Sequence, residues 1–443
     1  MSFTSASTTS VTENTGGTFY TAQATASNGQ AVTYAIAGGT DAARFTMAAD
    51  GTLAFAAQPD FERPGDANGD NLYQITLRAS AGNATAQLGL SVTVTNSKEG
   101  IAVRRIATGF TDPVCIDFLN ERLAPTAGPQ GLIAVGERGG KIYQIDGTTG
   151  ARTELADVFA NKAPAEMIEC KSFLRNRTYY AGLYAVVREA DGRAWMQRYD
   201  PDVLAEMQIL PSGAPPAEVR LINGPDGEFY MAIGSNSGPA AQDPASRLGK
   251  FFRLIQADPY AGASIQPGYF TPSVIGDGLR APGGGSAVDG RILLSDRGAT
   301  AEHELSFVLP GVGPFDFGWP NWEGTVPMVG SPPAAGIGPS LVYPVGTGAR
   351  QGTGILSGWL YGGPAAELQG RYVFGDDTGL IWSIPVALLI DGRLHGAADL
   401  EDRTADFVPD AGTIDSPVGF AADDMGRFYI LDSDGEVFRV DGS

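Results

Sequence analysis

The sequence predicts an all-β protein in two parts, a small β-sandwich over residues 1–98 followed by a six-bladed β-propeller over residues 99–443. Three observations support this prediction. The chain has 443 residues, more than a single hydrophobic core usually serves. It contains 60 glycines and 29 prolines but only 18% charged residues, which favours short strands joined by tight turns. After residue 100, one pattern of two short apolar strands recurs six times.

The first part shows the alternation of apolar and polar residues that is typical of half-buried strands, at 32–36, 72–79 and 88–95. Turn residues stand at 49–51 and 80–83. About seven short strands in about 90 residues are typical of an immunoglobulin-like sandwich. We therefore expect a sandwich of this kind in the first part.

A loop rich in oxygen donors interrupts the first part between residues 60 and 71. Six of its side chains carry a carboxylate or an amide oxygen: Asp60, Glu62, Asp66, Asn68, Asp70 and Asn71. Calcium accepts about six to eight such oxygens in a flexible geometry, and Gly65 and Gly69 allow the loop to fold around an ion. The alternative is a solvated polar turn without a metal, and the composition leaves both interpretations open.

In the second part, each repeat has a glycine, a short apolar strand, a polar loop and another strand, with a threonine replacing the glycine once. The repeats begin at Gly131, Thr178, Gly227, Gly290, Gly370 and Gly426. Six units over residues 101–443 average about 57 residues, enough for a four-stranded blade with its loops. We expect a terminal strand at 436–440 to close the ring and the long insertions within 254–290 and 319–370 to decorate one mouth. A two-sheet sandwich is the competing fold.

The charge pattern and the apolar pattern exclude several functions. The net charge is −20 and no run of lysine and arginine occurs, which argues against nucleic-acid binding. No apolar stretch of about 18 residues occurs, so we expect no membrane span. Residues 1–5 show neither a basic region nor an apolar core, so no signal peptide is visible. Cys115 and Cys170 can form at most one disulfide, and the sequence leaves their pairing open.

The oxygen-rich loop belongs to a wider set of matching segments, at 11–15, 59–62, 66–71, 72–80 and 92–96. With these segments, residues 1–98 resemble bacterial cadherin-like domains over nearly their whole length. The resemblance implies that calcium is bound by a set of carboxylates: Glu13, Asp60, Glu62, Asp66 and Asp70. Modules of this kind space, present or adhere, so we expect calcium to stiffen the domain rather than to catalyse.

Six segments of the second part follow one another in an order typical of one family: residues 224–234, 241–254, 278–283, 316–320, 370–376 and 420–430. With these segments, residues 101–443 resemble the soluble glucose and sorbosone dehydrogenase propellers. The resemblance implies bound pyrroloquinoline quinone (PQQ) and calcium, and oxidation of a sugar or alcohol at the propeller mouth.

The catalytic base that this resemblance implies is not present. In the family, a histidine eight residues before the turn that begins at Gly224 accepts the proton of the sugar hydroxyl. Here that position holds Pro216, which has no titratable group. Glu218 is the nearest alternative base. The chain has two histidines. We expect His303 in an exposed or capped loop, with a role as base as the weaker hypothesis, and His395 in a turn.

The resemblance also implies a cofactor site near residue 280. Arg280 matches a quinone-binding arginine, although a structural loop residue is an equal alternative, and Ala281 stands where the family has an asparagine. The backbone carbonyl of Gly298 and the carboxylate of Glu304 match calcium ligands. Trp322 is the aromatic residue that we expect to be exposed and to contact a ligand, although packing between blades is the alternative for its aromatic neighbourhood.

Because Pro216 and Ala281 replace residues that the chemistry requires, we expect a secreted or surface protein that binds calcium. Its degenerate propeller would bind a glycan, a sugar or a surface protein, and an adhesive role fits such a module. The alternative is a PQQ- and calcium-dependent aldose or alcohol dehydrogenase in which Glu218 replaces the base. The calcium module indicates an extracellular location, with type I secretion as the route expected by analogy.

Overall fold

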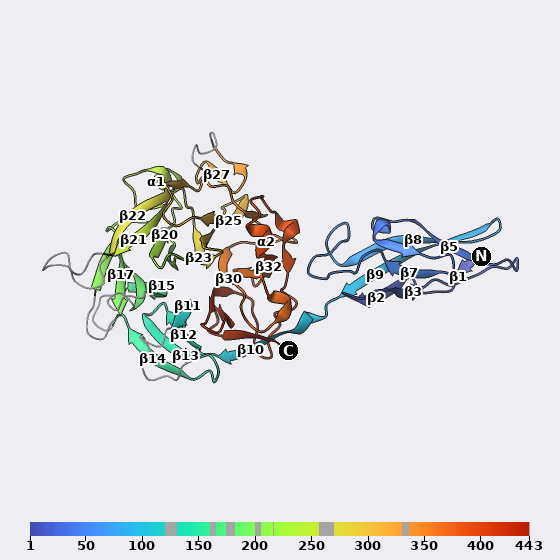
Figure 1. Ribbon diagram of the computed structural model, residues 1–443, viewed down its shortest axis with the longest axis horizontal. Coiled ribbons are helices and arrows are strands. Elements are labelled where there is room, and N and C mark those ends of the chain that lie inside the picture. Colours follow the sequence, from blue (N-terminus) through green and yellow to red (C-terminus); the bar gives the residue numbers. More distant parts are fainter. Residues whose placement is uncertain are drawn as a thin grey trace. The chain divides into compact units, whose positions relative to one another are not determined.

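A computed structural model describes residues 1–119, 131–159, 165–173, 182–199, 205–215, 217–256, 270–329 and 336–442. The chain forms two compact units, Met1–Glu99 and Gly100–Ser443, and nearly all of its regular structure is β-strand (Figure 1). The described helices are single turns, among them α1 (Gly238–Gln242) and α2 (Val386–Leu389). Among the described residues there is no helix of the length and apolarity that a membrane span requires.

The first unit is a β-sandwich, as the sequence predicts. One sheet has the order β2 (Thr8–Thr12), β9 (Ala84–Thr95), β8 (Leu72–Ala81), β5 (Thr33–Gly38). The other has the order β3 (Thr18–Thr21), β7 (Thr52–Phe55), β6 (Phe45–Met47), and β1 (Ser2–Phe3) pairs with β4 (Ala24–Thr25). Alternate residues of β8, from Tyr73 to Ala79, are buried between the sheets, which explains the alternation in the sequence.

The described residues of the second unit form six sheets of four or five strands. Blade 1 consists of β11 (Pro113–Leu119), β12 (Leu132–Glu137), β13 (Lys141–Asp146) and β14 (Arg152–Asp157). Blade 2 consists of β15 (Ala165–Phe173), β16 (Gly182–Glu189), β17 (Ala194–Tyr199) and β18 (Ala205–Leu210). Blade 3 consists of β19 (Val219–Asn223), β20 (Phe229–Ile233), β21 (Lys250–Gln256), β22 (Phe270–Asp277) and β26 (Phe315–Asp316).

Blade 4 consists of β23 (Pro282–Val288), β24 (Arg291–Asp296), β25 (Glu302–Val308) and β29 (Leu341–Pro344). Blade 5 consists of β30 (Ile355–Leu360), β31 (Arg371–Asp376), β32 (Ile381–Pro385) and β33 (Glu401–Asp402). Blade 6 consists of β34 (Pro417–Ala422), β35 (Phe428–Asp432), β36 (Val437–Gly442) and β10 (Ile101–Ala107). Figure 1 shows these sheets arranged in a ring, with β11, β15, β23 and β30 toward its centre.

The first strand of the propeller closes the ring with the last. β10 pairs antiparallel with β36, in a register that places Ile101 opposite Gly442 and Arg105 opposite Phe438. The sixth blade is therefore built from both ends of the unit. This pairing confirms the prediction of a six-bladed propeller that a terminal strand closes, and it leaves few strand edges unpaired.

Apolar clusters between neighbouring blades hold the ring together. Blades 4 and 5, for example, share a cluster in which Leu293 and Tyr343 meet Phe374 and Trp382. The second strands of the blades are buried on both faces, as Ile292, Leu293 and Leu294 show in β24. Burial on both faces explains why the repeats read as continuous apolar runs rather than as alternating ones.

The segment between β25 and β29 adds a strand to blade 3. β26 pairs with β22, the last strand of blade 3, with Phe315 opposite Gly276. β26 therefore extends the outer edge of this blade, because the edge of β22 offers hydrogen-bonding groups to another strand. A small hairpin of β27 (Trp322–Glu323) and β28 (Val326–Pro327) follows it.

Candidate functional site

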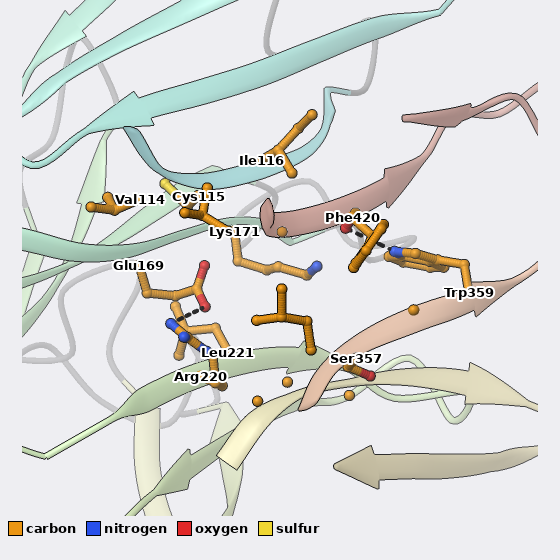
Figure 2. A pocket seen from close by; sticks show the side chains of 17 residues that line it. Val114, Cys115, Ile116, Glu169, Lys171, Arg220, Leu221, Ser357, Trp359 and Phe420 are labelled. Carbon is orange, nitrogen blue, oxygen red and sulfur yellow. Dashed lines mark hydrogen bonds and ion pairs between the residues drawn. The ribbon is translucent and has the colours of Figure 1, made fainter. Parts of the chain in front are cut away.

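The first strand of each blade lines a central channel. A cavity of about 60 Å³ within it is lined by residues of β11, β15, β19, β23, β30 and β34 (Figure 2). Three glycines of β23, at 283–285, allow the neighbouring strands to approach closely. A Cβ atom at Gly283 would collide with the backbone carbonyl of Ile355 in β30.

Two ion pairs lie at the wall of this channel. Lys171 Nζ lies 2.9 Å from Asp117 Oδ1, and Arg220 lies 3.6 Å from a Glu169 oxygen. The Lys171 ammonium also lies over the ring of Trp359, 5.2 Å from its centroid. These charged side chains are 3–15% exposed, so each depends on its partner for compensation.

Glu169 is the most perturbed of these groups. Burial raises the pKa of Glu169 to about 7, although Arg220, Lys171 and a hydrogen bond from the Cys170 N–H act in the opposite direction. A carboxyl with a pKa near neutrality can change its protonation state under physiological conditions. Glu169 was not predicted from the sequence. The signal that was available is a Glu-Cys-Lys sequence inside an inner strand.

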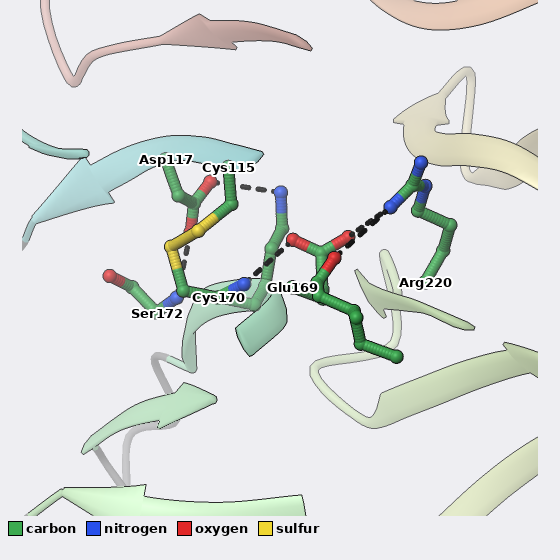
Figure 3. The surroundings of a disulfide bond; sticks show 8 residues. Cys115, Asp117, Glu169, Cys170, Ser172 and Arg220 are labelled. Atoms are coloured by element: carbon green, nitrogen blue, oxygen red, sulfur yellow. Dashed lines mark hydrogen bonds and ion pairs between the residues drawn. A yellow bond between two sulfur atoms is a disulfide. The ribbon is translucent and has the colours of Figure 1, made fainter. Parts of the chain in front are cut away.

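A disulfide ties the first two blades together beside the channel. Cys115 in β11 is bonded to Cys170 in β15, with the two Cα atoms 5.6 Å apart (Figure 3). The structure thus answers the question of pairing that the sequence leaves open. The bond also places Glu169, which directly precedes Cys170, in a part of the wall that is covalently fixed.

A larger cavity of about 350 Å³ opens where the inner strands begin, and it forms the mouth of the propeller. All six blades contribute to its wall. Its charged residues are four arginines and three acids: Arg138, Arg188, Arg220, Arg297, Glu166, Glu218 and Asp377. We call this the mouth cavity. Arg220 lines both the mouth cavity and the channel.

Each arginine of the mouth cavity has a carboxylate partner. Glu166 bridges Arg138 at 3.3 Å and Arg188 at 3.0 Å. Arg220 lies 3.3 Å from Glu218. Arg297 lies 3.5 Å from Asp377. Charges of opposite sign therefore alternate around the mouth.

The arginines act together on Glu218. The pKa of Glu218 is lowered by the guanidinium of Arg220 and, to a smaller extent, by Arg297, Arg188 and Arg138, against the effect of burial. A carboxylate that is stabilised in this way is a weak proton acceptor. Glu218 therefore lies in the mouth, but its surroundings do not suit a general base. Pro216 lies outside the described residues.

Four residues of the predicted cofactor site do come together. Arg280, Gly298, Glu304 and Trp322 line one small pocket, which we call the side pocket. Arg280 has a structural role there, because its Nη1 donates to the carbonyls of Arg297 (2.9 Å) and Gly298 (3.0 Å). The Gly298 carbonyl, which was expected to bind calcium, therefore accepts a hydrogen bond from the Arg280 guanidinium instead.

Glu304 and Trp322, the acidic and aromatic members of this set, are both shielded from solvent. Burial, and then the charges of Asp296 and Glu302, raise the pKa of Glu304 well above its ordinary value, which favours the protonated form. Trp322 is half-buried, and its indole Nε1 is fully covered, so the expectation that it is exposed is wrong. It packs within the insertion after β26 instead of standing in the mouth.

The histidines also differ from the expectation. His303 is not in an exposed or capped loop but is fully buried in β25, and burial lowers its pKa. Its Nδ1 accepts a hydrogen bond from the Gly298 N–H (3.2 Å), and its Nε2 bonds to the Gly352 carbonyl (3.0 Å). Both ring nitrogens are engaged, so His303 cannot take a proton from a ligand. His395 follows a turn and lies between Asp391 and Asp399, 3.2 Å from each.

In the first unit, three of the predicted calcium ligands come together. The carboxylate oxygens of Glu13, Asp60 and Glu62 lie within 4.8 Å of one another. Glu13 and Glu62 are 3% and 1% exposed, so their charges are poorly solvated. Hard oxygen donors in such a group suit calcium.

Asp66 and Asp70 do not join this carboxylate cluster. Asp66 accepts hydrogen bonds from the N–H groups of Asp70 (3.0 Å) and Asn71 (3.1 Å). Asp70 accepts one from the Leu72 N–H (2.9 Å). Both aspartates shape the turn before β8, which is the polar-turn alternative for this part of the loop.

The comparisons with known proteins bear on the fold. No family model matches the chain, and no curated protein matches it. The soluble aldose sugar dehydrogenase of Escherichia coli, in its apo-form, matches with 16% identity and a TM-score of 0.54, over 77% of this chain and 100% of that one. A glucose dehydrogenase matches with 18% identity and a TM-score of 0.53, over the same shares. So does an oxidoreductase described as a glucose dehydrogenase from Thermus thermophilus, with 18% identity and a TM-score of 0.53. At these identities, the likeness establishes the propeller fold alone.

Proposed function

We propose that this protein binds a glycan at the mouth of its propeller without oxidising it, and binds calcium through its cadherin-like sandwich. The observation that carries the first part is the mouth cavity. It has about 350 Å³ of space, a wall from all six blades, and charged planar side chains that can donate to and accept from hydroxyl groups. The proteins of similar fold include dehydrogenases of aldose sugars and glucose, which supports a saccharide as the ligand.

The residues present do not fit PQQ and calcium as a catalytic pair. The carbonyl that calcium would require, that of Gly298, accepts a hydrogen bond from the Arg280 guanidinium at 3.0 Å. A calcium ion there would face a fixed positive charge. Because the same bond holds Arg280 in the side pocket, this arginine is also not presented to a quinone in the mouth cavity.

A dehydrogenase with a replaced base is the second candidate, and Glu169 is the observation that favours it. Its pKa of about 7 would suit a general base better than that of Glu218. Its side chain is only 11% exposed and is paired with Arg220, which stands between it and the mouth cavity. Access for a substrate hydroxyl is therefore poor.

Two measurements on the full chain distinguish a protein that only binds a saccharide from one that oxidises it. Calorimetric titration with a panel of oligosaccharides should show binding that Arg297→Gln weakens. Arg291→Gln serves as the matched control, because Arg291 pairs with Asp289 and does not line the mouth cavity. Dye reduction is then assayed with added PQQ, calcium and sugars. Turnover that Glu218→Gln or Glu169→Gln abolishes would overturn the non-catalytic proposal.

The calcium part rests on the carboxylate cluster and has its own test. Three carboxylates within 4.8 Å repel one another, so an ion that neutralises them should stabilise the sandwich. We expect calcium to raise the melting temperature of the first unit in the full chain. The rise should disappear in Glu13→Gln/Glu62→Gln and persist in the control Asp66→Asn/Asp70→Asn. A rise that survives the first pair of changes would contradict the assignment.

Two features support an extracellular location for this function. A calcium site is filled where calcium is abundant, as it is outside cells. The Cys115–Cys170 disulfide would also persist in an oxidising environment. Secretion to the cell surface is therefore part of the proposal.

A further inference from the structure

We infer that the saccharide bound at the propeller mouth carries a carboxylate, as a uronic acid residue does, and that this carboxylate takes the place of Glu218 beside Arg220. The inference rests on the proposed function and names the class of its ligand. It is carried by the charge of the mouth cavity, by the length of its ion pairs and by the exposure of Glu218.

The charge of the mouth cavity is opposite to that of the chain. The protein has 30 basic and 50 acidic residues, a net charge of −20. The mouth cavity is lined by four arginines and three acids, with no lysine among its lining residues. Arginine recognises planar carboxylates through paired N–H donors. A local excess of guanidinium groups on such an acidic protein favours an anionic ligand.

Two of these arginines form ion pairs that are longer than a strong hydrogen bond. The distance from Arg220 to Glu218 is 3.3 Å and that from Arg297 to Asp377 is 3.5 Å. A strong charge-assisted hydrogen bond is about 2.7–2.9 Å long. The pair of Arg427 with Asp423 reaches 2.6 Å in the same protein. A ligand carboxylate that approached Arg220 or Arg297 more closely than these partners do would therefore form the stronger bond.

Glu218 has room to turn away from Arg220 when a second anion takes its place. Its side chain is 44% exposed, whereas that of Arg220 is 15% exposed. It precedes β19, and its backbone is held by the Gly234 N–H, which donates to the Glu218 carbonyl (2.9 Å). The carboxylate is thus free to turn toward solvent while the backbone stays in place. In the free protein the Glu218 carboxylate pairs with Arg220, and the ligand carboxylate takes its place on binding.

A neutral sugar would fit this site less well. It would separate Arg220 from Glu218 without supplying a compensating charge. The poorly solvated guanidinium would then keep only the longer ion pair with Glu169, at 3.6 Å. A carboxylate restores the charge balance. The four arginines that together lower the pKa of Glu218 would stabilise the ligand's carboxylate by the same field.

The test uses the full-length protein and a matched pair of ligands. Trigalacturonic acid is titrated beside its fully methyl-esterified form, which has the same rings without the charge, and beside PQQ as a carboxylate-bearing quinone. We expect the acid to bind at least about tenfold more tightly than the ester, with an affinity that falls as salt rises. Glu218→Gln removes the competing anion and should tighten binding of the acid by about three- to fivefold, the range of an exposed ion pair.

The control is Glu154→Gln, which removes a surface carboxylate paired with Lys141 on an outer strand and should leave affinity unchanged. Equal binding of acid and ester would overturn this inference and leave the proposed function standing. If no saccharide binds, the proposed function and this inference both fail. Binding of the acid that Glu218→Gln weakens would overturn the displacement of Glu218. If PQQ bound more tightly than the acid and dye reduction were observed, both the proposed function and this inference would be wrong, and the dehydrogenase would be the better assignment.

Discussion

The buried carboxyl of Glu169 should make the stability of the propeller depend on pH. Its folded pKa is about 7, against an ordinary value of 4.5. A carboxyl whose pKa is raised on folding binds its proton more tightly in the native state. Its favourable contribution is therefore complete below about pH 4.5 and is lost as the pH rises through 7. Replacing Glu169 by glutamine removes this dependence, because the amide does not titrate.

The magnitude follows from the two pKa values. The interval between 4.5 and about 7 corresponds to about 3 kcal/mol, at about 1.4 kcal/mol per pKa unit. Most of this falls between pH 5 and pH 8, so the wild type should lose about 2.5 kcal/mol there relative to Glu169→Gln. The other ion pairs of the wall stay intact in the variant, since Lys171 keeps Asp117 and Arg220 keeps Glu218.

The assay is urea unfolding of wild type and Glu169→Gln at pH 5, 6, 7 and 8, followed by tryptophan fluorescence. Trp359 lines the same channel and serves as a reporter. The difference in unfolding free energy between the two proteins should grow from pH 5 to pH 7 in favour of the variant and level off toward pH 8. A difference that is the same at every pH would refute the reasoning. The control Glu154→Gln, on the outer strand β14, should reproduce the wild-type profile.

Two further predictions concern other buried contacts of the propeller. Replacing Cys115 and Cys170 by serine should lower the unfolding free energy by about 4 kcal/mol, because the disulfide closes a loop of 55 residues. Denaturant unfolding measures this change, and an unchanged midpoint would contradict the prediction. Arg403→Met should cost about 3–5 kcal/mol, since Arg403 lies 3.2 Å from Glu401 and 3.3 Å from the fully buried Asp406, which would lose its counter-charge. A melting temperature within about 2 °C of the wild type would show that this buried pair contributes little.

The fold could be predicted from the sequence because strands and turns depend on local residue patterns. Alternation in 72–79 predicts a half-buried strand, and Tyr73 to Ala79 do alternate in β8. The apolar run after Gly290 predicts a fully buried strand, which is β24. Even ring closure by the terminal strand follows from its position at the end of the repeats. The two strand assignments need only neighbours along the chain, and ring closure needs only the order of the repeats.

The candidate site was reached only in part. Glu218 was singled out by its nearness to Pro216 and does lie in the mouth cavity. Its arginine neighbours were missed, because Arg138, Arg188 and Arg297 come from three different blades. Nothing in the chain near any one of them indicates that they share a cavity.

Strand periodicity and turn residues are properties of adjacent positions, so the all-β class, the six repeats and the acidic loop of the first unit could be predicted from the chain alone. Three findings required the folded chain: the carboxylates of Glu13, Asp60 and Glu62 come together, the Arg280 guanidinium donates to the Gly298 carbonyl, and four arginines line one mouth. The physical reason is that charge acts through space. Groups separated by tens of residues along the chain shift one another's ionisation once the closed ring brings them within a few ångströms.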